Sequence, residues 1–131
     1  MASQPDTNRL NRQEAKSKTV LLVEDEVLIR IPVAESLRDI GYEVIEAGNA
    51  DEAIIIVNSG IHVDLVISDV QMPGQMDGRA LVKYLTLERP DIPIILASGA
   101  LIAPNIGDLV LGVRKPYLPS DIATFAKNII G

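Results

Sequence analysis

Residues 19–25 of the chain read Thr19-Val20-Leu21-Leu22-Val23-Glu24-Asp25. The β-branched and aliphatic run from Thr19 to Val23 is typical of a strand buried on both faces, as in a parallel sheet. A weaker, edge-like run follows at Val44–Ala47, and stronger runs lie at Val63–Ser68, Ile92–Ala97 and Leu109–Val113. The sequence therefore predicts five strands.

Segments with helical spacing of apolar residues separate these strands. The first should end at Gly41 and turn one face to the core, formed by Val27, Ile31, Ala34, Leu37 and Ile40. A second should begin after Gly48 or Asn49, a third should span Gly78–Glu88, and Ser120 is a candidate N-cap of the last. Strands that alternate with helices predict an α/β fold with a mostly parallel sheet and helices on both faces.

The composition of the 131-residue chain narrows its possible functions. The absence of cysteine excludes a disulfide scaffold and a thiolate metal site, and the single histidine, His62, excludes a site built on two imidazoles. A net charge of −6 disfavours nucleic acid as a partner, because phosphate contacts need clustered Lys and Arg. No apolar run approaches the roughly 20 residues of a membrane span, and no secretory signal is visible. We expect a cytoplasmic protein without nucleic-acid or membrane partners.

The chain divides into a short polar segment and one domain. Residues 1–18 contain almost no aliphatic side chains and are expected to form a flexible amino-terminal tail. Residues 19–131 have the length and apolar content of a single domain.

Polar side chains with complementary chemistry follow the predicted strands. Glu24 and Asp25 follow the first strand, Asp69 ends the third, Ser98 the fourth, and Lys115 comes just after the fifth. The carboxyl ends of parallel strands meet at one edge of the sheet, where such folds place their chemistry. Each residue alone has an ordinary explanation, as a helix cap, a turn former or a surface lysine. Together they predict one site.

The residue types at this edge suit phosphoryl transfer. Neighbouring carboxylates repel one another unless a hard cation lies between them, and ligands that are all oxygen favour Mg²⁺. Asp69 can then act as the nucleophile, while Lys115 and the hydroxyl of Ser98 interact with the transferred group.

Four motifs at these positions resemble the receiver domain of two-component response regulators. They are Val20-Leu-Leu-Val-Glu-Asp-Glu, Asp64-Leu-Val-Ile-Ser-Asp-Val-Gln-Met-Pro-Gly, Ile94-Ile-Leu-Ala-Ser-Gly and Lys115-Pro-Tyr. The resemblance covers residues 19–131. It implies a flavodoxin-like (βα)5 fold, a doubly wound sheet with strand order 2-1-3-4-5.

The resemblance also implies a role for each site residue. Asp69 matches the phosphoacceptor, Ser98 the switch Ser/Thr, and Lys115 the lysine that pairs with the phosphoryl group. The metal ligands would be Asp25 directly, Glu24 through water, Asp69, and the backbone carbonyl of Gln71. Pro116 is expected to follow a cis peptide bond.

Two departures from the family pattern bear on signalling. Gly112 occupies the position where many receivers carry a switching aromatic residue, so that mode of switching should be lost. The segment between Ser98 and Lys115 is short and lacks a helical period, so we expect a reduced fourth helix. Ala97-Ser98-Gly99 resembles an atypical, often stand-alone subgroup of receivers.

The sequence thus predicts a single-domain response regulator. A histidine kinase or phosphotransfer protein would phosphorylate Asp69 in the presence of Mg²⁺, and the product would act through a downstream protein. Beyond its own phosphorylation and dephosphorylation, no enzyme activity is expected. The alternative that stays open is a receiver-like binding module that works without phosphorylation. A haloacid-dehalogenase-type phosphatase needs an aspartate where Gln71 stands, and a flavodoxin needs aromatic residues and a phosphate loop in place of Glu24-Asp25-Glu26.

Overall fold

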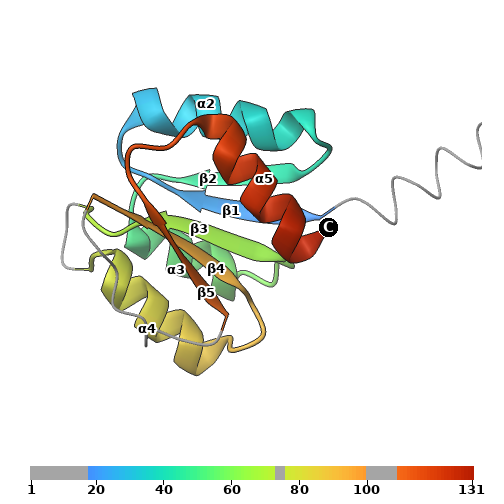
Figure 1. Cartoon of the computed structure of the whole chain (residues 1–131). Coiled ribbons are helices and arrows are strands. Elements are labelled where there is room, and N and C mark those ends of the chain that lie inside the picture. The colour runs from blue at the N-terminus through green and yellow to red at the C-terminus, as the bar shows by residue number, and fades with distance from the viewer. Residues whose placement is uncertain (1–17, 73–75, 100–108) are drawn as a thin grey trace, which may run out of the picture.

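The computed structural model describes residues 18–72, 76–99 and 109–131. Five parallel strands form one sheet in the order β2-β1-β3-β4-β5, which confirms the doubly wound, flavodoxin-like fold (Figure 1). The strands are β1 (Thr19–Val23), β2 (Glu43–Ala47), β3 (Leu65–Asp69), β4 (Ile94–Ser98) and β5 (Val110–Arg114). The helices of the described residues are α2 (Val27–Asp39), α3 (Ala50–Asn58), α4 (Gly78–Glu88) and α5 (Pro119–Ile130).

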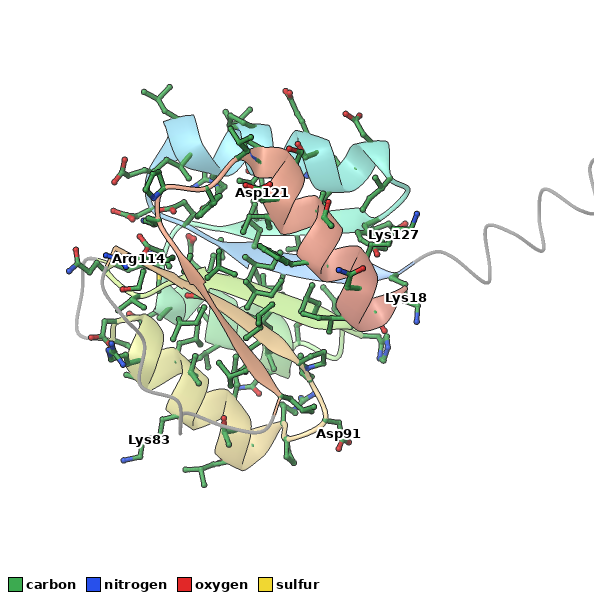
Figure 2. The ribbon with its side chains drawn as sticks, in the orientation of Figure 1. Lys18, Lys83, Asp91, Arg114, Asp121 and Lys127 are labelled. Carbon is green, nitrogen blue, oxygen red and sulfur yellow. The ribbon has the colours of Figure 1, made fainter. Side chains whose placement is uncertain are left out.

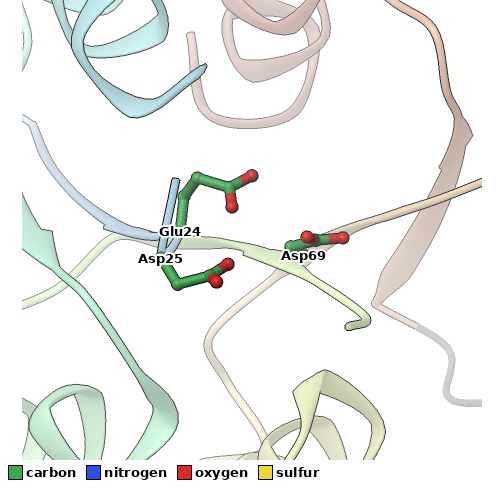
Figure 3. A group of neighbouring side chains, drawn as sticks. All are labelled: Glu24, Asp25 and Asp69. Carbon is green, nitrogen blue, oxygen red and sulfur yellow. The ribbon is translucent and has the colours of Figure 1, made fainter. Parts of the chain in front are cut away.

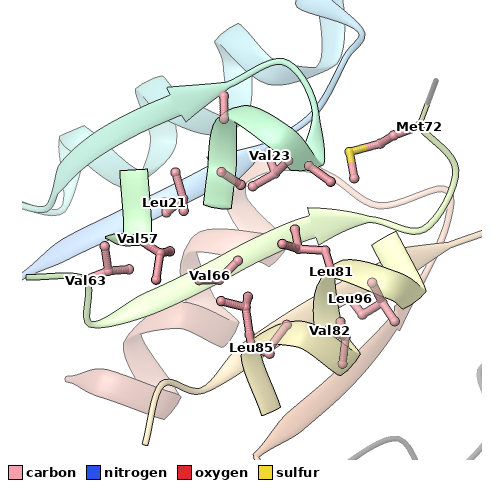
Figure 4. Close-up of a cluster of buried hydrophobic side chains, with 14 of the residues drawn as sticks. Leu21, Val23, Val57, Val63, Val66, Met72, Leu81, Val82, Leu85 and Leu96 are labelled. Atoms are coloured by element: carbon pink, nitrogen blue, oxygen red, sulfur yellow. The ribbon is translucent and has the colours of Figure 1, made fainter. Parts of the chain in front are cut away.

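Two hydrophobic clusters lie on opposite faces of the sheet. Helices α3 and α4 cover one face and α2 and α5 the other (Figure 1). Successive strand residues point to opposite faces, so Leu21 packs toward α3 and α4 (Figure 4) and Leu22 toward α2 and α5. This is why β1 is apolar and buried from Val20 to Val23. Charged side chains such as Lys83 and Lys127 lie on the outer surface (Figure 2).

The first residues of α3 and α5 show which local signals set the start of a helix. The side chain of Asn49 accepts a hydrogen bond from the Glu52 N–H at 2.8 Å, which confirms it as the N-cap of α3. The prediction for Ser120 was wrong, because α5 begins at Pro119 and its N-cap is Leu118. Proline is preorganised for the first helical position, and the Asp121 carboxylate accepts the Leu118 N–H at 2.9 Å.

The buried face of α2 differs from the predicted one. Ala34 and Leu37 are buried as expected, together with Val33, whereas Val27 and Ile31 are exposed. The first turn of α2 follows the carboxyl end of β1, so it lies at the edge of the sheet with less of the sheet beneath it. Ile40 is also exposed, because the helix has ended at Asp39.

Two predictions lie outside the described residues. The tail was predicted over residues 1–18, of which only Lys18 is described, and the reduced fourth helix falls within residues 100–108. Among the helices of the described ranges, none combines the length and apolarity needed to cross a membrane.

Candidate functional site

The acidic residues predicted from two separate strands lie together at the carboxyl edge of the sheet. Val23 of β1 pairs with Ser68 of β3, so the residues that follow these two positions emerge side by side. Carboxylate oxygens of Glu24, Asp25 and Asp69 all lie within 4.8 Å of one another (Figure 3). The sheet register therefore brings together residues about 45 positions apart in the sequence.

Lys115 supplies the cation of this site. Its Nζ lies 3.0 Å from Oδ2 of Asp69, whose side chain is only 6% exposed. The backbone N–H of Lys115 donates to the carbonyl oxygen of Ser98 at 2.7 Å, which ties the end of β5 to the end of β4. The peptide bond between Lys115 and Pro116 is cis, as the family resemblance implied.

An open cavity of about 510 Å³ lies over these groups. Among the described residues it is lined by Asp25, Glu26, Asp69, Gln71, Met72, Asp77 and Lys115. Glu24 and Ser98 are buried and lie outside that lining. The sequence reasoning missed Asp77, although an aspartate directly before a helical segment is an N-cap signal, and its Oδ1 accepts the Ala80 N–H at 2.9 Å.

Burial disfavours the ionised form of the Glu24 side chain. Its side chain is almost fully buried, and this desolvation raises its pKa to about 7; the charge of Asp69 acts in the same direction. The Glu26 N–H donates to its Oε2 at 3.2 Å and partly opposes the shift. In the part of the chain that the structure describes, two further carboxylates lie beside Glu24 and one lysine pairs with them, which leaves an excess of negative charge. Oxygen donors with this charge suit a hard divalent cation such as Mg²⁺.

Tyr117 lies near enough to Glu24 and Asp69 for their charges to act on its hydroxyl. Burial raises its pKa to about 12, and the charges of Glu24 and Asp69 add to the effect. Its ring packs against the hydrophobic cluster under α2 and α5. Tyr117 therefore forms part of the apolar wall behind the acidic groups.

Residues 20–109 match the model of the response regulator receiver domain. The chain belongs to the response regulator receiver family. It is 49% identical over 119 residues to the transcriptional regulatory protein PdtaR of Mycobacterium tuberculosis, covering 82% of this chain and 54% of the relative. It is 40% identical over 120 residues to the sensor kinase CckA of Brucella abortus, covering 87% of this chain and 13% of the relative. The receiver thus spans about half or less of these curated relatives.

Solved receivers share the fold. The receiver domain of the hybrid histidine kinase CckA is 36% identical, with a TM-score of 0.72 over 86% of this chain and 99% of that one. The chemotaxis response regulator CheY4 of Vibrio cholerae is 28% identical, with a TM-score of 0.76 over 86% and 98%. The chain therefore contains a receiver, a signalling module of two-component systems, and phosphoryl acceptance is the general function of this family. The atypical, stand-alone subgroup stays a prediction.

Gly78 permits close packing of the receiver's α4 against the phosphoacceptor position. A Cβ atom built at Gly78 would overlap the carbonyl oxygen of Asp69 and lie 2.7 Å from Cα of Val70. The Gly78 N–H donates to the Val70 carbonyl at 2.8 Å. The absence of a side chain thus lets the helix begin directly against the end of β3.

Gly112 stands in β5 opposite Leu96, where it is exposed and presents no side chain. Gly112 therefore supplies no aromatic ring at the position where many receivers carry one. The loss of aromatic switching stays a prediction.

Proposed function

We propose that this receiver accepts a phosphoryl group on Asp69 from a phosphohistidine of a histidine kinase or phosphotransfer protein. The observation that carries the proposal is the placement of Asp69, 6% exposed, 3.0 Å from Lys115 Nζ and within 4.8 Å of two further acids. A carboxylate in such a site combines a nucleophilic oxygen with groups that neutralise charge on an incoming phosphate.

The transfer step uses groups that the fold has already brought together. An oxygen of Asp69 attacks phosphorus and forms an O–P bond, while the P–N bond to the donor imidazole breaks and its electron pair returns to the ring nitrogen. Lys115 pairs with the negative charge on the phosphoryl oxygens. Ser98, at the end of the neighbouring strand, is the group proposed to donate its hydroxyl to one of these oxygens. Hydrolysis of the acyl phosphate reverses the modification, and no other catalytic activity is proposed.

The acids fit a magnesium ion as the cofactor of this step. Asp25 and Asp69 would bind it directly, Glu24 through a water molecule, and the backbone carbonyl of Gln71 would complete the protein ligands. When bound, Mg²⁺ neutralises charge on the transferring group. The buried Glu24 carboxylate supports this assignment, because a bound cation would offset the desolvation and the neighbouring charge of Asp69 that raise its pKa.

An apolar patch beside the site suits a phosphodonor protein. We name it the rim patch, formed by Val27, Leu28 and Ile31 of α2 with Leu118 before α5, all exposed. The first turn of α2 begins two residues after Asp25, so a protein docked here would lie over the cavity. Phosphorylation would then change which downstream protein is bound, because it converts the singly charged Asp69 carboxylate into an acyl phosphate with about two negative charges.

The proposal is tested by intact mass after incubation with acetyl phosphate and Mg²⁺. We expect a gain of about 80 Da, one phosphoryl group on one carboxylate, which is lost with EDTA and in Asp69→Asn. Asp64→Asn is the matched control, since Asp64 accepts the Thr19 N–H at the opposite end of the sheet. If Mg²⁺ binds but no adduct forms under any condition, the protein is instead a receiver-like module that binds partners without phosphorylation.

A further inference from the structure

Arg30 of α2 connects the edge of the sheet to the acidic site. Its Nη1 donates to the carbonyl oxygen of Glu24 at 2.8 Å, and its Nε donates to Oε1 of Glu46 on β2 at 3.0 Å. The side chain is only 19% exposed, so its interactions are partly sheltered from solvent. One guanidinium thus bridges an edge-strand carboxylate and the backbone at the metal-ligand positions.

Glu46 is itself held by a second arginine. Arg38 lies two helical turns after Arg30, and its Nη2 donates to Oε2 of Glu46 at 3.2 Å and to the Val44 carbonyl at 3.0 Å. Both carboxylate oxygens of Glu46 therefore have a guanidinium partner. These two bonds hold the Glu46 carboxylate in one orientation. Because the guanidinium of Arg30 is planar and rigid, the bond from its Nε to Glu46 also orients its Nη1 toward the Glu24 carbonyl.

The bond from Arg30 acts on the peptide that joins the two proposed metal ligands. The Glu24 carbonyl belongs to the peptide group between Glu24 and Asp25. The N–H of Glu24 itself donates to the Ala47 carbonyl at 3.0 Å, so both sides of this residue are held by hydrogen bonds. Asp25 follows in a bend outside any strand or helix. Fixing the plane of this peptide fixes the direction in which Asp25 leaves the backbone.

We propose that Arg30, oriented by Glu46, is a positioning residue that sets the direction of Asp25 and thereby the affinity of the site for Mg²⁺. This inference rests on the proposed function, since it concerns the same metal site. Groups that orient metal ligands commonly contribute about 10-fold to 100-fold in metal affinity. Because Arg30 makes one hydrogen bond to this backbone, we expect its loss to lower the affinity for Mg²⁺ about 10-fold.

The sign of the effect separates positioning from simple electrostatics. Removing a cation beside an acidic cluster should strengthen Mg²⁺ binding if charge alone matters. Removing a group that orients Asp25 should weaken it. Arg30→Lys is the decisive variant, because it keeps the charge but cannot reach both the Glu24 carbonyl and Glu46 with a rigid fork. Arg38→Met is the matched control, because it removes a guanidinium from Glu46 without touching Glu24.

The experiment measures the Mg²⁺ dependence of phosphorylation by acetyl phosphate in wild type, Arg30→Lys, Arg30→Met and Arg38→Met. Calorimetric titration with Mg²⁺ alone gives the affinity independently of chemistry, and thermal unfolding in EDTA shows that each variant is folded. We expect the Mg²⁺ concentration for half-maximal rate to rise about 10-fold in Arg30→Met and clearly in Arg30→Lys. Arg38→Met should stay within about 2-fold of wild type, well below the effect of a group that orients a ligand, because Arg30 keeps its own bonds to Glu46 and to the Glu24 carbonyl.

The outcomes distinguish this inference from the proposed function. If wild type itself gains no Asp69-dependent adduct, the proposed function fails. If wild type is phosphorylated but both Arg30 variants keep the wild-type Mg²⁺ dependence or bind Mg²⁺ more tightly, the positioning role is overturned. An equal loss in Arg38→Met would also overturn it, because the effect would then reflect the helix as a whole. If Arg30→Met unfolds, the folded Arg30→Lys protein still decides the question by calorimetry.

Discussion

Replacing Gly78 with alanine tests how tightly α4 is packed against the phosphoacceptor. The added Cβ would overlap the Asp69 carbonyl oxygen and sit 2.7 Å from Val70 Cα and 2.8 Å from the Asp69 carbonyl carbon. All three neighbours are backbone atoms of a buried strand end, so no side chain can rotate away. The Val70 N–H is also bonded to the Ala97 carbonyl at 2.9 Å, which holds this backbone in place.

The cost follows from these contacts. Overpacking a rigid site costs about 1–3 kcal/mol, and contacts made only with backbone place Gly78→Ala in the upper half of that range. Alanine regains up to about 1 kcal/mol through its better helix propensity. The net loss is about 2 kcal/mol, and at about 3–5 °C per kcal/mol for a chain of this length the Tm should fall by about 6–10 °C.

Thermal and urea unfolding in EDTA measure this loss, with Gly99→Ala as the control. No atom of the described residues lies within 4 Å of a Cβ at Gly99, so that variant should unfold within about 0.5 kcal/mol of wild type. The overlap in Gly78→Ala also displaces the Asp69 backbone, and we expect slower phosphorylation by acetyl phosphate. A Tm for Gly78→Ala within about 2 °C of wild type would refute the reasoning, because it would mean that α4 moves off β3 at little cost.

Two further perturbations probe the charge and the surface of the site. Burial raises the pKa of Glu24 from 4.5 to about 7, so the folded protein retains a proton that the unfolded chain releases; in EDTA, the free energy of unfolding should fall as the pH rises through this interval. Glu24→Gln should flatten that slope and raise the Tm at pH 8, and identical slopes in thermal unfolding would contradict the assignment. Leu28 is 89% exposed, so Leu28→Ser should leave stability and acetyl phosphate reactivity unchanged. It should nevertheless slow transfer from any histidine kinase that phosphorylates the wild type, and equal kinase rates would remove the rim patch from the docking surface.

Much of the fold was predictable because its signals are local. A strand buried on both faces needs apolar residues at every position, and β1 satisfies this from Val20 to Val23. The N-cap of α3 was predictable because a cap is made within one turn, as Asn49 and Glu52 show. Ser120 misled because proline at the first helical position outweighs a capping hydroxyl one residue later. The buried face of α2 was predicted wrongly, because periodicity identifies an apolar stripe but does not show how far the sheet extends beneath the helix.

The candidate site was predictable in its residues but not in its energetics. Parallel strands end at one edge, so Asp25, Asp69 and Lys115 could be placed together from their positions after apolar runs. The raised pKa of Glu24 could not be predicted, because it depends on how completely the surrounding chain excludes water. Asp69 lies against Gly78 and Lys115 only because the sheet register and the start of α4 bring them there.

The sequence by itself determined the order of strands and helices, the edge at which the chemistry lies and the residue types that carry it. These follow from patterns a few residues long, repeated after each strand. Only the tertiary structure decided that Arg30 binds Glu46, 16 positions away, and holds the Glu24 carbonyl at the same time. Such contacts depend on the distance and direction between α2 and the edge strand. The burial of Glu24 and the contacts of Arg30 depend on how these elements pack, and no local pattern encodes them.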